Sequence, residues 1–141
     1  MWDVLIQHTT VESIMNDKGL AQIGDNLVNL CYSLAKSIVL ERSGGQKVRD
    51  SVLARAIRAT SVYKHIGHRT DMGGAGDAYE AIMAWLWMKE KITIERIVEL
   101  LVENLSLDSK TGRKEEGELA SVAFQLLLEF VIPSLPGHPF V

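Results

Sequence analysis

The sequence predicts an all-α protein that forms one domain, with about six or seven helices over residues 1–141. Apolar residues recur at spacings of three and four in several long segments, which is the period of a helix buried along one face. No segment sustains the alternation of apolar and polar residues that is typical of a strand. With 47% hydrophobic residues, a chain of 141 residues is long enough to bury a core without a metal or a disulfide.

The first half of the chain contains three predicted helices. Thr9 followed by Glu12 forms a capping box, which predicts a short helix to about residue 16, with a turn at 16–19. Residues 20–41 form the longest regular segment, whose apolar stripe is Leu20, Ile23, Leu27, Leu30, Cys31, Leu34 and Ile38. A third helix is predicted at about 48–64, and the glycines at 66–76 predict a loop after it.

The second half contains three more predicted helices. The helix that begins near Asp77 carries bulky apolar residues around most of its circumference, which indicates burial on nearly all sides. Helices at about 93–104 and 115–132 follow, and three prolines after residue 132 end the regular structure. The inward side of the last helix is expected to be Leu119, Val122, Ala123, Leu126, Leu127 and Phe130.

Composition excludes several classes of protein. A single cysteine, Cys31, rules out an internal disulfide and suits a reducing compartment. No apolar run approaches the length of a membrane span, and no glycine loop matches a phosphate-cradling nucleotide site. We therefore expect a cytoplasmic protein with no membrane partner and no organic cofactor.

The charge distribution is uneven although the net charge is only -3. Between Arg42 and Arg69 there are seven Lys or Arg residues and one acid, Asp50, whereas acids concentrate at 90–103 and 115–129. A basic middle section in an acidic chain favours a phosphate-bearing partner. On charge alone, a solvated helix face remains an equal alternative. The candidate phosphate-binding residues are Arg49, Arg55, Arg58, Lys64 and Arg69.

The candidate metal ligands are three carboxylates. Asp77 and Glu80 are three residues apart, so both project from one side of the first turn of their predicted helix. Gly24 lies inside a helix, where it costs about 1 kcal/mol relative to alanine. That placement is explained if another backbone, at Ala81 and Ala84, approaches closely and brings Asp25 to the acidic pair. The competing interpretation is that Asp77 and Glu80 only complement the helix dipole.

Two segments, in order and at a suitable spacing, resemble the signatures of the ribonuclease III family. Residues 20–25, Leu-Ala-Gln-Ile-Gly-Asp, are similar to the "LEFLGD" signature, and closer to the "LAYIGD" form of mini-ribonuclease III. Residues 77–82, Asp-Ala-Tyr-Glu-Ala-Ile, resemble the second signature, "DAxEAL". Residues 48–54 weakly resemble the helix between the signatures, and the likeness covers about residues 9–105.

The resemblance implies an all-helical, homodimeric endonuclease domain that cuts double-stranded RNA with Mg²⁺, or Mn²⁺ as a substitute, leaving 5′-phosphate and 3′-hydroxyl ends. Asp25, Asp77 and Glu80 match the metal-binding acids of the family and are the expected catalytic and metal-binding residues. The dimer is expected to use apolar residues left over on the helix at 20–41. Val28, Tyr32 and Val39 flank that surface, although core packing is the favoured role for each of them.

The chain departs from the family at three positions. Ala21 and Lys18 stand where the first signature has acids, and Arg55 stands where the middle helix usually has another acid. The mini enzymes also lack the first of these acids, so cleavage remains the expected activity, with one well-held Mg²⁺ ion. There is also no appended domain for binding double-stranded RNA.

Three alternatives remain open from the sequence. A ribonuclease III-like protein that binds RNA without cutting it is favoured by Ala21 and Arg55. An all-helical, Mg²⁺-dependent nucleotide pyrophosphohydrolase would need a paired-glutamate signature, for which only Glu115 and Glu116 are available. A structural dimerisation module would leave the converging acids unexplained.

Overall fold

The computed structural model describes residues 1–140, which are all-helical and contain no strand. Three short 3₁₀ helices, η1 (Asp3–Leu5), η2 (Tyr63–Ile66) and η3 (Ile132–Ser134), accompany the longer elements. The α-helices are α1 (Val11–Met15), α2 (Lys18–Leu40), α3 (Asp50–Arg58), α4 (Met72–Met88), α5 (Ile94–Glu103) and α6 (Arg113–Val131). The predicted all-α class is confirmed.

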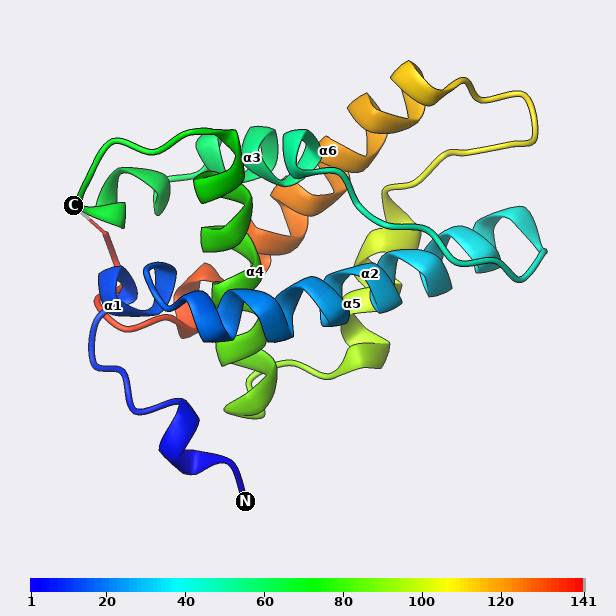
Figure 1. Ribbon diagram of the computed structural model, residues 1–141. Helices are drawn as coiled ribbons and strands as arrows, with labels where there is room; N and C mark the ends of the chain where they lie inside the picture. The colour runs from blue at the N-terminus through cyan, green and yellow to red at the C-terminus, as the bar shows by residue number, and fades with distance from the viewer. Residues whose placement is uncertain (141) are drawn as a thin grey trace.

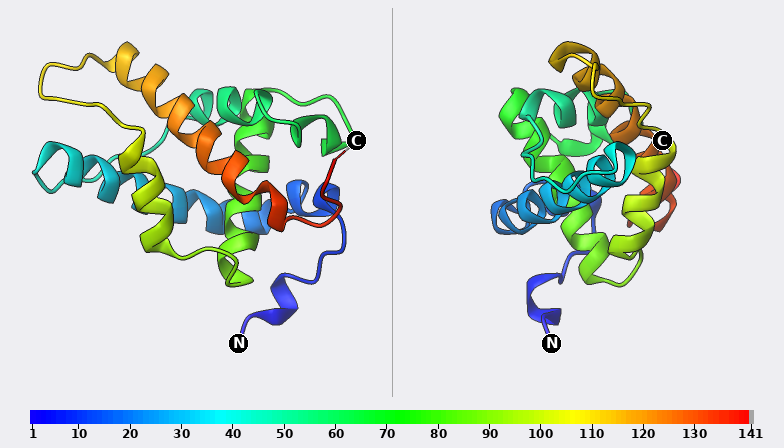
Figure 2. Two further views of the ribbon diagram at one scale, coloured as in Figure 1. Left: turned by 180° about the vertical axis from the view of Figure 1, so that it is seen from behind. Right: turned by 90° about the vertical axis from the view of Figure 1, so that its right-hand side faces the viewer.

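Helix α4 is the central element of the fold. It packs against α1, α2 and α3, and α2 runs across it (Figure 1). Every residue from Ala78 to Leu86 is buried, as the apolar residues around this helix predicted. Helices α5 and α6 lie behind α2 and α3 in this view, as the turned views in Figure 2 show. Tyr79 connects α4 to α6 by donating a hydrogen bond to the carbonyl group of Phe124 at 2.5 Å.

The beginnings of three helices differ from the prediction. The N-cap of α1 is Thr10, whose side chain accepts from the Ser13 N–H, so the capping box at Thr9 was wrong. Helix α2 begins at Lys18 because Asp17 caps it, accepting from the Leu20 N–H at 3.0 Å. Helix α4 begins at Met72 because Asp71 caps it, accepting from the Gly74 N–H at 2.8 Å. Three of the glycines that predicted a loop are therefore helical.

Because α4 begins earlier than predicted, Asp77 and Glu80 do not lie in its first turn. Asp77 is the sixth residue of α4 and Glu80 the ninth, counted from Met72. A helix dipole acts on charges within the first turn, so neither carboxylate is placed to complement it. The competing interpretation of this pair is therefore wrong.

The predicted inward faces of α2 and α6 were partly wrong. On α2 the buried residues include Leu20, Leu27 and Cys31 of the predicted stripe, together with the predicted flank residues Val28 and Tyr32. Three apolar residues of the predicted stripe, which we call the α2 stripe, are instead exposed: Leu30, Leu34 and Ile38. On α6 the exposed apolar residues, which we call the α6 stripe, are Val122, Leu126 and Phe130.

The segment Arg113–Ser134 is long and apolar enough to cross a membrane by length and composition, since it contains an 18-residue window with a mean hydropathy of 1.3. The expectation that no segment approaches a membrane span was therefore wrong. The core helix of a soluble protein satisfies the same criteria. Here α6 packs one side against α3 and α5, and 44% of that 18-residue window is buried.

Candidate active site

The site is built where α2 crosses α4. Gly24 lies against the main chain of Glu80, and a Cβ atom at position 24 would overlap the Glu80 carbonyl group. The predicted close approach of these two helices is thus present, but the nearest atoms belong to Glu80, not to Ala81 or Ala84. The contact brings the residue after Gly24, Asp25, beside the Glu80 side chain.

Helix α3 also begins beside α4. Asp50 is the first residue of α3, and a Cβ atom at Gly76 would be 3.5 Å from the Asp50 Oδ1 atom, an ordinary van der Waals distance. Asp77, the next residue of α4, is partly exposed. Three helices therefore direct carboxylates to one place.

A cavity of about 500 Å³ receives these side chains, and we call it the carboxylate pocket. All three predicted acids, Asp25, Asp77 and Glu80, line it. Asp50 is a fourth acid in the lining, which the sequence analysis noted only as the one acid of a basic segment. No local signal in the sequence identifies it, because the packing of α3 beside Gly76 is what brings Asp50 to this cavity.

Glu80 is the most perturbed of the four acids. Its side chain is buried, with the residue only 4% exposed. Burial, then a hydrogen bond to Asp25, and then the negative charges of Asp25, Asp77 and Asp50 raise the pKa of Glu80 to about 9. Glu80 therefore keeps its proton at neutral pH when no cation is bound, and its carboxyl group donates a hydrogen bond to the Asp25 carboxylate.

The polar residue Asn29 helps to hold the carboxylate pocket in place. Asn29 donates to the Asp25 Oδ1 atom at 3.1 Å and accepts from the Val48 N–H at 2.7 Å. It therefore orients Asp25 and ties the segment before α3 to α2. Asn29 was not predicted as a site residue, since a single polar residue on a helix carries no recognisable signal.

Two lysines also line the carboxylate pocket. Lys18 donates from Nζ to the Asp77 Oδ2 atom at 3.2 Å, and Lys47 is the second. Lys18 occupies a position where the resembled signature has an acid. Its ammonium group is largely exposed, so this ion pair is weak and easily exchanged.

The donor set suits a hard divalent cation. Four carboxylates at one cavity repel one another, and Mg²⁺ prefers oxygen ligands of this kind while keeping several waters. Within residues 1–140, no three Asp, Glu, His or Cys side chains are grouped closely enough to hold a metal ion as they stand. A cation held by few direct ligands and by water would fit this open arrangement.

The predicted phosphate-binding residues lie outside the carboxylate pocket. Arg49 and Arg55 line a second cavity between α3 and α6. The guanidinium group of Arg58 lies 5.9 Å from the centre of the Tyr63 ring. Lys64 and Arg69 are exposed, in η2 and in the segment before α4. The structure thus brings two of the five together.

The paired glutamates 115 and 116 have a structural explanation. Glu116 accepts from the Tyr32 hydroxyl at 2.7 Å and from the Lys36 ammonium group at 2.9 Å. These contacts tie α6 to α2, and they leave the pyrophosphohydrolase alternative without its signature.

A comparison with protein-family models matched residues 18–135 to the model described as Ribonuclease III. A comparison with curated proteins gave no match. The matched region contains α2 to α6 and all four acids of the carboxylate pocket.

Proposed function

Because the chain belongs to the ribonuclease III family, we propose that it is a Mg²⁺-dependent endoribonuclease acting on double-stranded RNA. Membership indicates a nuclease or RNA-processing role in general. The observation that supports the finer proposal is the carboxylate pocket, where Asp25, Asp50, Asp77 and Glu80 converge from three helices.

The roles of the acids follow from their surroundings. Asp25, Asp77 and Glu80 would hold the cation, and Asp50 adds a fourth carboxylate at the same cavity. Bound Mg²⁺ would supply a Lewis acid for the scissile phosphate and make water more acidic near neutral pH. Glu80 releases its proton when a cation compensates its neighbours, and Asn29 keeps Asp25 oriented.

The lysines of the pocket would contact the substrate. Lys18 and Lys47 present ammonium groups at the rim of a cavity that is otherwise acidic. An RNA phosphate that enters the cavity would attract Lys18 away from Asp77, because that ion pair is solvent-exposed and weak. Lys18 would therefore pair with Asp77 in the RNA-free protein. After RNA binds, Lys18 would pair with the phosphate instead.

The exposed cations would contact the RNA backbone outside the pocket. Double-stranded RNA is recognised mainly by shape, phosphates and 2′-hydroxyls, so Arg49, Arg55, Arg58, Lys64 and Arg69 need not read bases. Such binding depends steeply on salt, because each phosphate contact releases counterions. Binding that ignores salt would contradict this part of the proposal.

A homodimer is the arrangement we propose for cutting both strands, since two strands need two sites related by a two-fold axis. The α2 stripe is the candidate interface, with Leu30, Leu34 and Ile38 exposed by 48%, 41% and 55%. The α2 stripe lies on the same helix as Asp25. A dimer interface formed by this stripe would therefore fix the distance between the two carboxylate pockets. The α6 stripe is the competing surface.

The deciding experiment compares the wild type with Glu80→Gln on an end-labelled RNA duplex with Mg²⁺. The wild type should yield products with 5′-phosphates, and Glu80→Gln should yield none while circular dichroism shows an unchanged helical spectrum. Equal cleavage by both proteins would remove the carboxylate pocket from the mechanism.

A second candidate function is RNA binding without cleavage. The observation that favours it is that Lys18 and Ala21 line the pocket where the family signature carries acids. Duplex RNA bound by the wild type but left intact with Mg²⁺ and with Mn²⁺ would support it over hydrolysis.

A further inference from the structure

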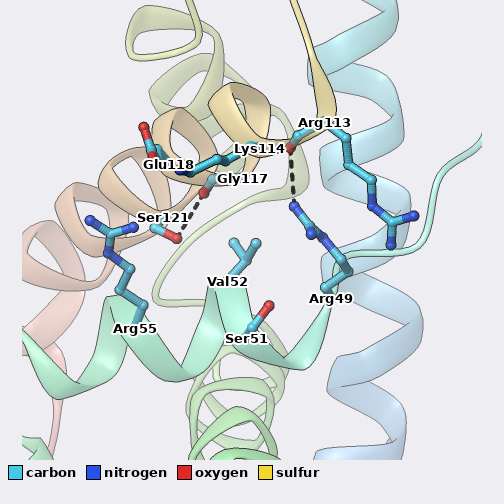
Figure 3. A pocket seen from close by; sticks show the side chains of 9 residues that line it. All are labelled: Arg49, Ser51, Val52, Arg55, Arg113, Lys114, Gly117, Glu118 and Ser121. Carbon is cyan, nitrogen blue, oxygen red and sulfur yellow. Dashed lines mark hydrogen bonds between the residues drawn. The ribbon is translucent and has the colours of Figure 1, made fainter.

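A second cavity, also of about 500 Å³, lies between the start of α3 and the first turns of α6. Figure 3 shows Arg49, the N-cap residue of α3, and Arg55 of α3 on opposite sides of it, both projecting towards α6, with Val52 between them. Arg113 and Lys114 contribute from the first turn of α6. We call this cavity the arginine pocket.

The arginine pocket carries a net positive charge. Its lining contains four cations, Arg49, Arg55, Arg113 and Lys114, but only one carboxylate, that of Glu118. Within residues 1–140, none of these four cations forms an ion pair. Cations that converge without an internal counterion attract an anion from outside.

The placement of two of these cations is unfavourable for the fold. Arg113 and Lys114 are the first two residues of α6, where the helix dipole disfavours positive charge, and Glu115 and Glu116 in the same turn offset them only in part. The N-cap residue is Gly112, which has no side chain that could accept a hydrogen bond from the first N–H groups of α6. A bound anion would interact favourably with both cations and with the helix dipole.

Contacts between α3 and α6 hold the cavity in this shape. Arg49 donates from Nη2 to the Arg113 carbonyl oxygen at 3.3 Å, so its guanidinium group lies across the start of α6. Gly117 makes room for that group, because a Cβ atom at position 117 would collide with it. The rest of the Arg49 guanidinium remains available to a ligand.

We propose that the arginine pocket binds a backbone phosphate of the same RNA duplex whose scissile phosphate enters the carboxylate pocket. Arginine suits this ligand, since its planar donors match the oxygens of a phosphate. No aromatic side chain lines the cavity, so it offers no stacking surface for a base. The two pockets meet at the start of α3, where Arg49 faces one and Asp50 the other.

This inference rests on the proposed function for its substrate, but its test does not need catalysis. In a Glu80→Gln background without divalent cations, we would measure the affinity for an RNA duplex by fluorescence anisotropy from 50 to 200 mM salt. The test variant adds Arg55→Gln and Arg113→Gln together. The matched control adds Lys91→Gln, an exposed cation in the turn between α4 and α5.

The double change should weaken binding by at least about ten-fold at low salt and reduce the slope of log affinity against log salt by about one, for the one phosphate that is no longer bound. Lys91→Gln should change neither quantity. The conservative pair Arg55→Lys and Arg113→Lys should keep most of the slope, because it retains the charges. A folded double variant with unchanged slope and affinity would overturn the proposal.

Titration with inorganic phosphate and with adenosine monophosphate separates a backbone site from a site for free phosphates. Weak binding of both, alongside the loss of duplex affinity in the double variant, supports the backbone assignment. Tight binding of either one with unchanged duplex affinity would overturn it. If the wild type binds duplex through these arginines but never cleaves it, the proposed hydrolysis fails while the arginine pocket stands.

Discussion

Gly24 of α2 lies directly against the main-chain carbonyl group of Glu80 in α4, so closely that no side chain fits between the two helices. This contact determines how deeply α2 seats on α4. It also determines the separation of Asp25 and Glu80, which share a hydrogen bond. Stability and the carboxylate pocket therefore depend on the same pair of residues.

Gly24→Ala should destabilise the protein by about 2–3 kcal/mol, as is typical when a well-packed contact is overfilled. The added methyl group meets main-chain atoms of Glu80, which cannot rotate away as a side chain would. Urea denaturation measures the change. Gly19→Ala in the same helix is the matched control, since its Cβ would be at an ordinary 3.4 Å from Asp17, and alanine should leave stability unchanged or raise it.

The raised pKa of Glu80 leads to a prediction of how the stability of the protein changes with pH in the absence of divalent cations. Its pKa is raised from the ordinary 4.5 to about 9, so between these values the folded chain holds a proton that the unfolded chain has released. The free energy of unfolding should therefore fall as pH rises through this window. In Glu80→Gln this contribution is absent, so the variant should be the more stable protein at pH 8 and lose that advantage near pH 4.5.

Binding of Mg²⁺ should compete with binding of the proton to Glu80. Because the cation replaces it, the rise in melting temperature on adding Mg²⁺ should be larger at pH 8 than at pH 5 in the wild type. Glu80→Gln should show little rise at either pH. An equal rise for both proteins at both pH values would indicate that Mg²⁺ binds elsewhere.

Asp50→Asn should raise the Mg²⁺ concentration needed for half-maximal cleavage by about ten-fold, the lower range for residues that support metal ligands. Asp50 lines the carboxylate pocket and raises the pKa of Glu80. Cleavage rates over a Mg²⁺ titration measure the effect. Asp108→Asn, an exposed acid between α5 and α6, is the control and should leave the titration curve in place.

Lys18→Gln should tighten Mg²⁺ binding only two- to five-fold, because the exposed pair with Asp77 is worth roughly 0.5–1 kcal/mol. Isothermal titration calorimetry on the RNA-free protein would detect the change. Cleavage at saturating Mg²⁺ should nevertheless slow, since the phosphate loses a cation. A faster reaction at saturating Mg²⁺ would show that Lys18 only competes with the metal.

The features that sequence patterns predicted well have a local cause. The spacing of apolar residues predicted α5 within one residue at each end. The acids Asp25, Asp77 and Glu80 were identified from a glycine, two small residues and two signatures, and all three line one cavity. Asp50 was not placed there, because only the packing of α3 beside Gly76 brings it to the pocket.

The features that sequence patterns missed have a non-local cause. Glycines at 73, 74 and 76 predicted a loop, but Asp71 caps a helix that α2 and α3 hold in place. Leu30 and Leu34 fit the same helical stripe as Leu27 and Cys31, yet only the second pair is buried. A core and an interface use the same side chains at the same spacing, so periodicity cannot separate them.

The two exposed stripes make the proposed dimer interface testable with a matched pair of variants. Leu34 on α2 is 41% exposed and Leu126 on α6 is 40% exposed, so glutamate should be tolerated equally well at either position in the monomer. If the α2 stripe forms the dimer, Leu34→Glu places two carboxylates together across the two-fold axis and should yield monomers in analytical ultracentrifugation. Leu126→Glu should leave the dimer intact.

Leu34→Glu and Leu126→Glu also test whether cleavage of both RNA strands depends on the dimer. Leu34→Glu should retain helical content and Mg²⁺-dependent stabilisation, because Asp25 and Glu80 belong to one chain, but coordinated cutting of both strands should be lost. Dimer loss in Leu126→Glu alone would move the interface to α6. A monomeric wild type at micromolar concentration, with full cleavage of both strands, would remove the dimer from the mechanism, because a single chain would then reach each strand in turn.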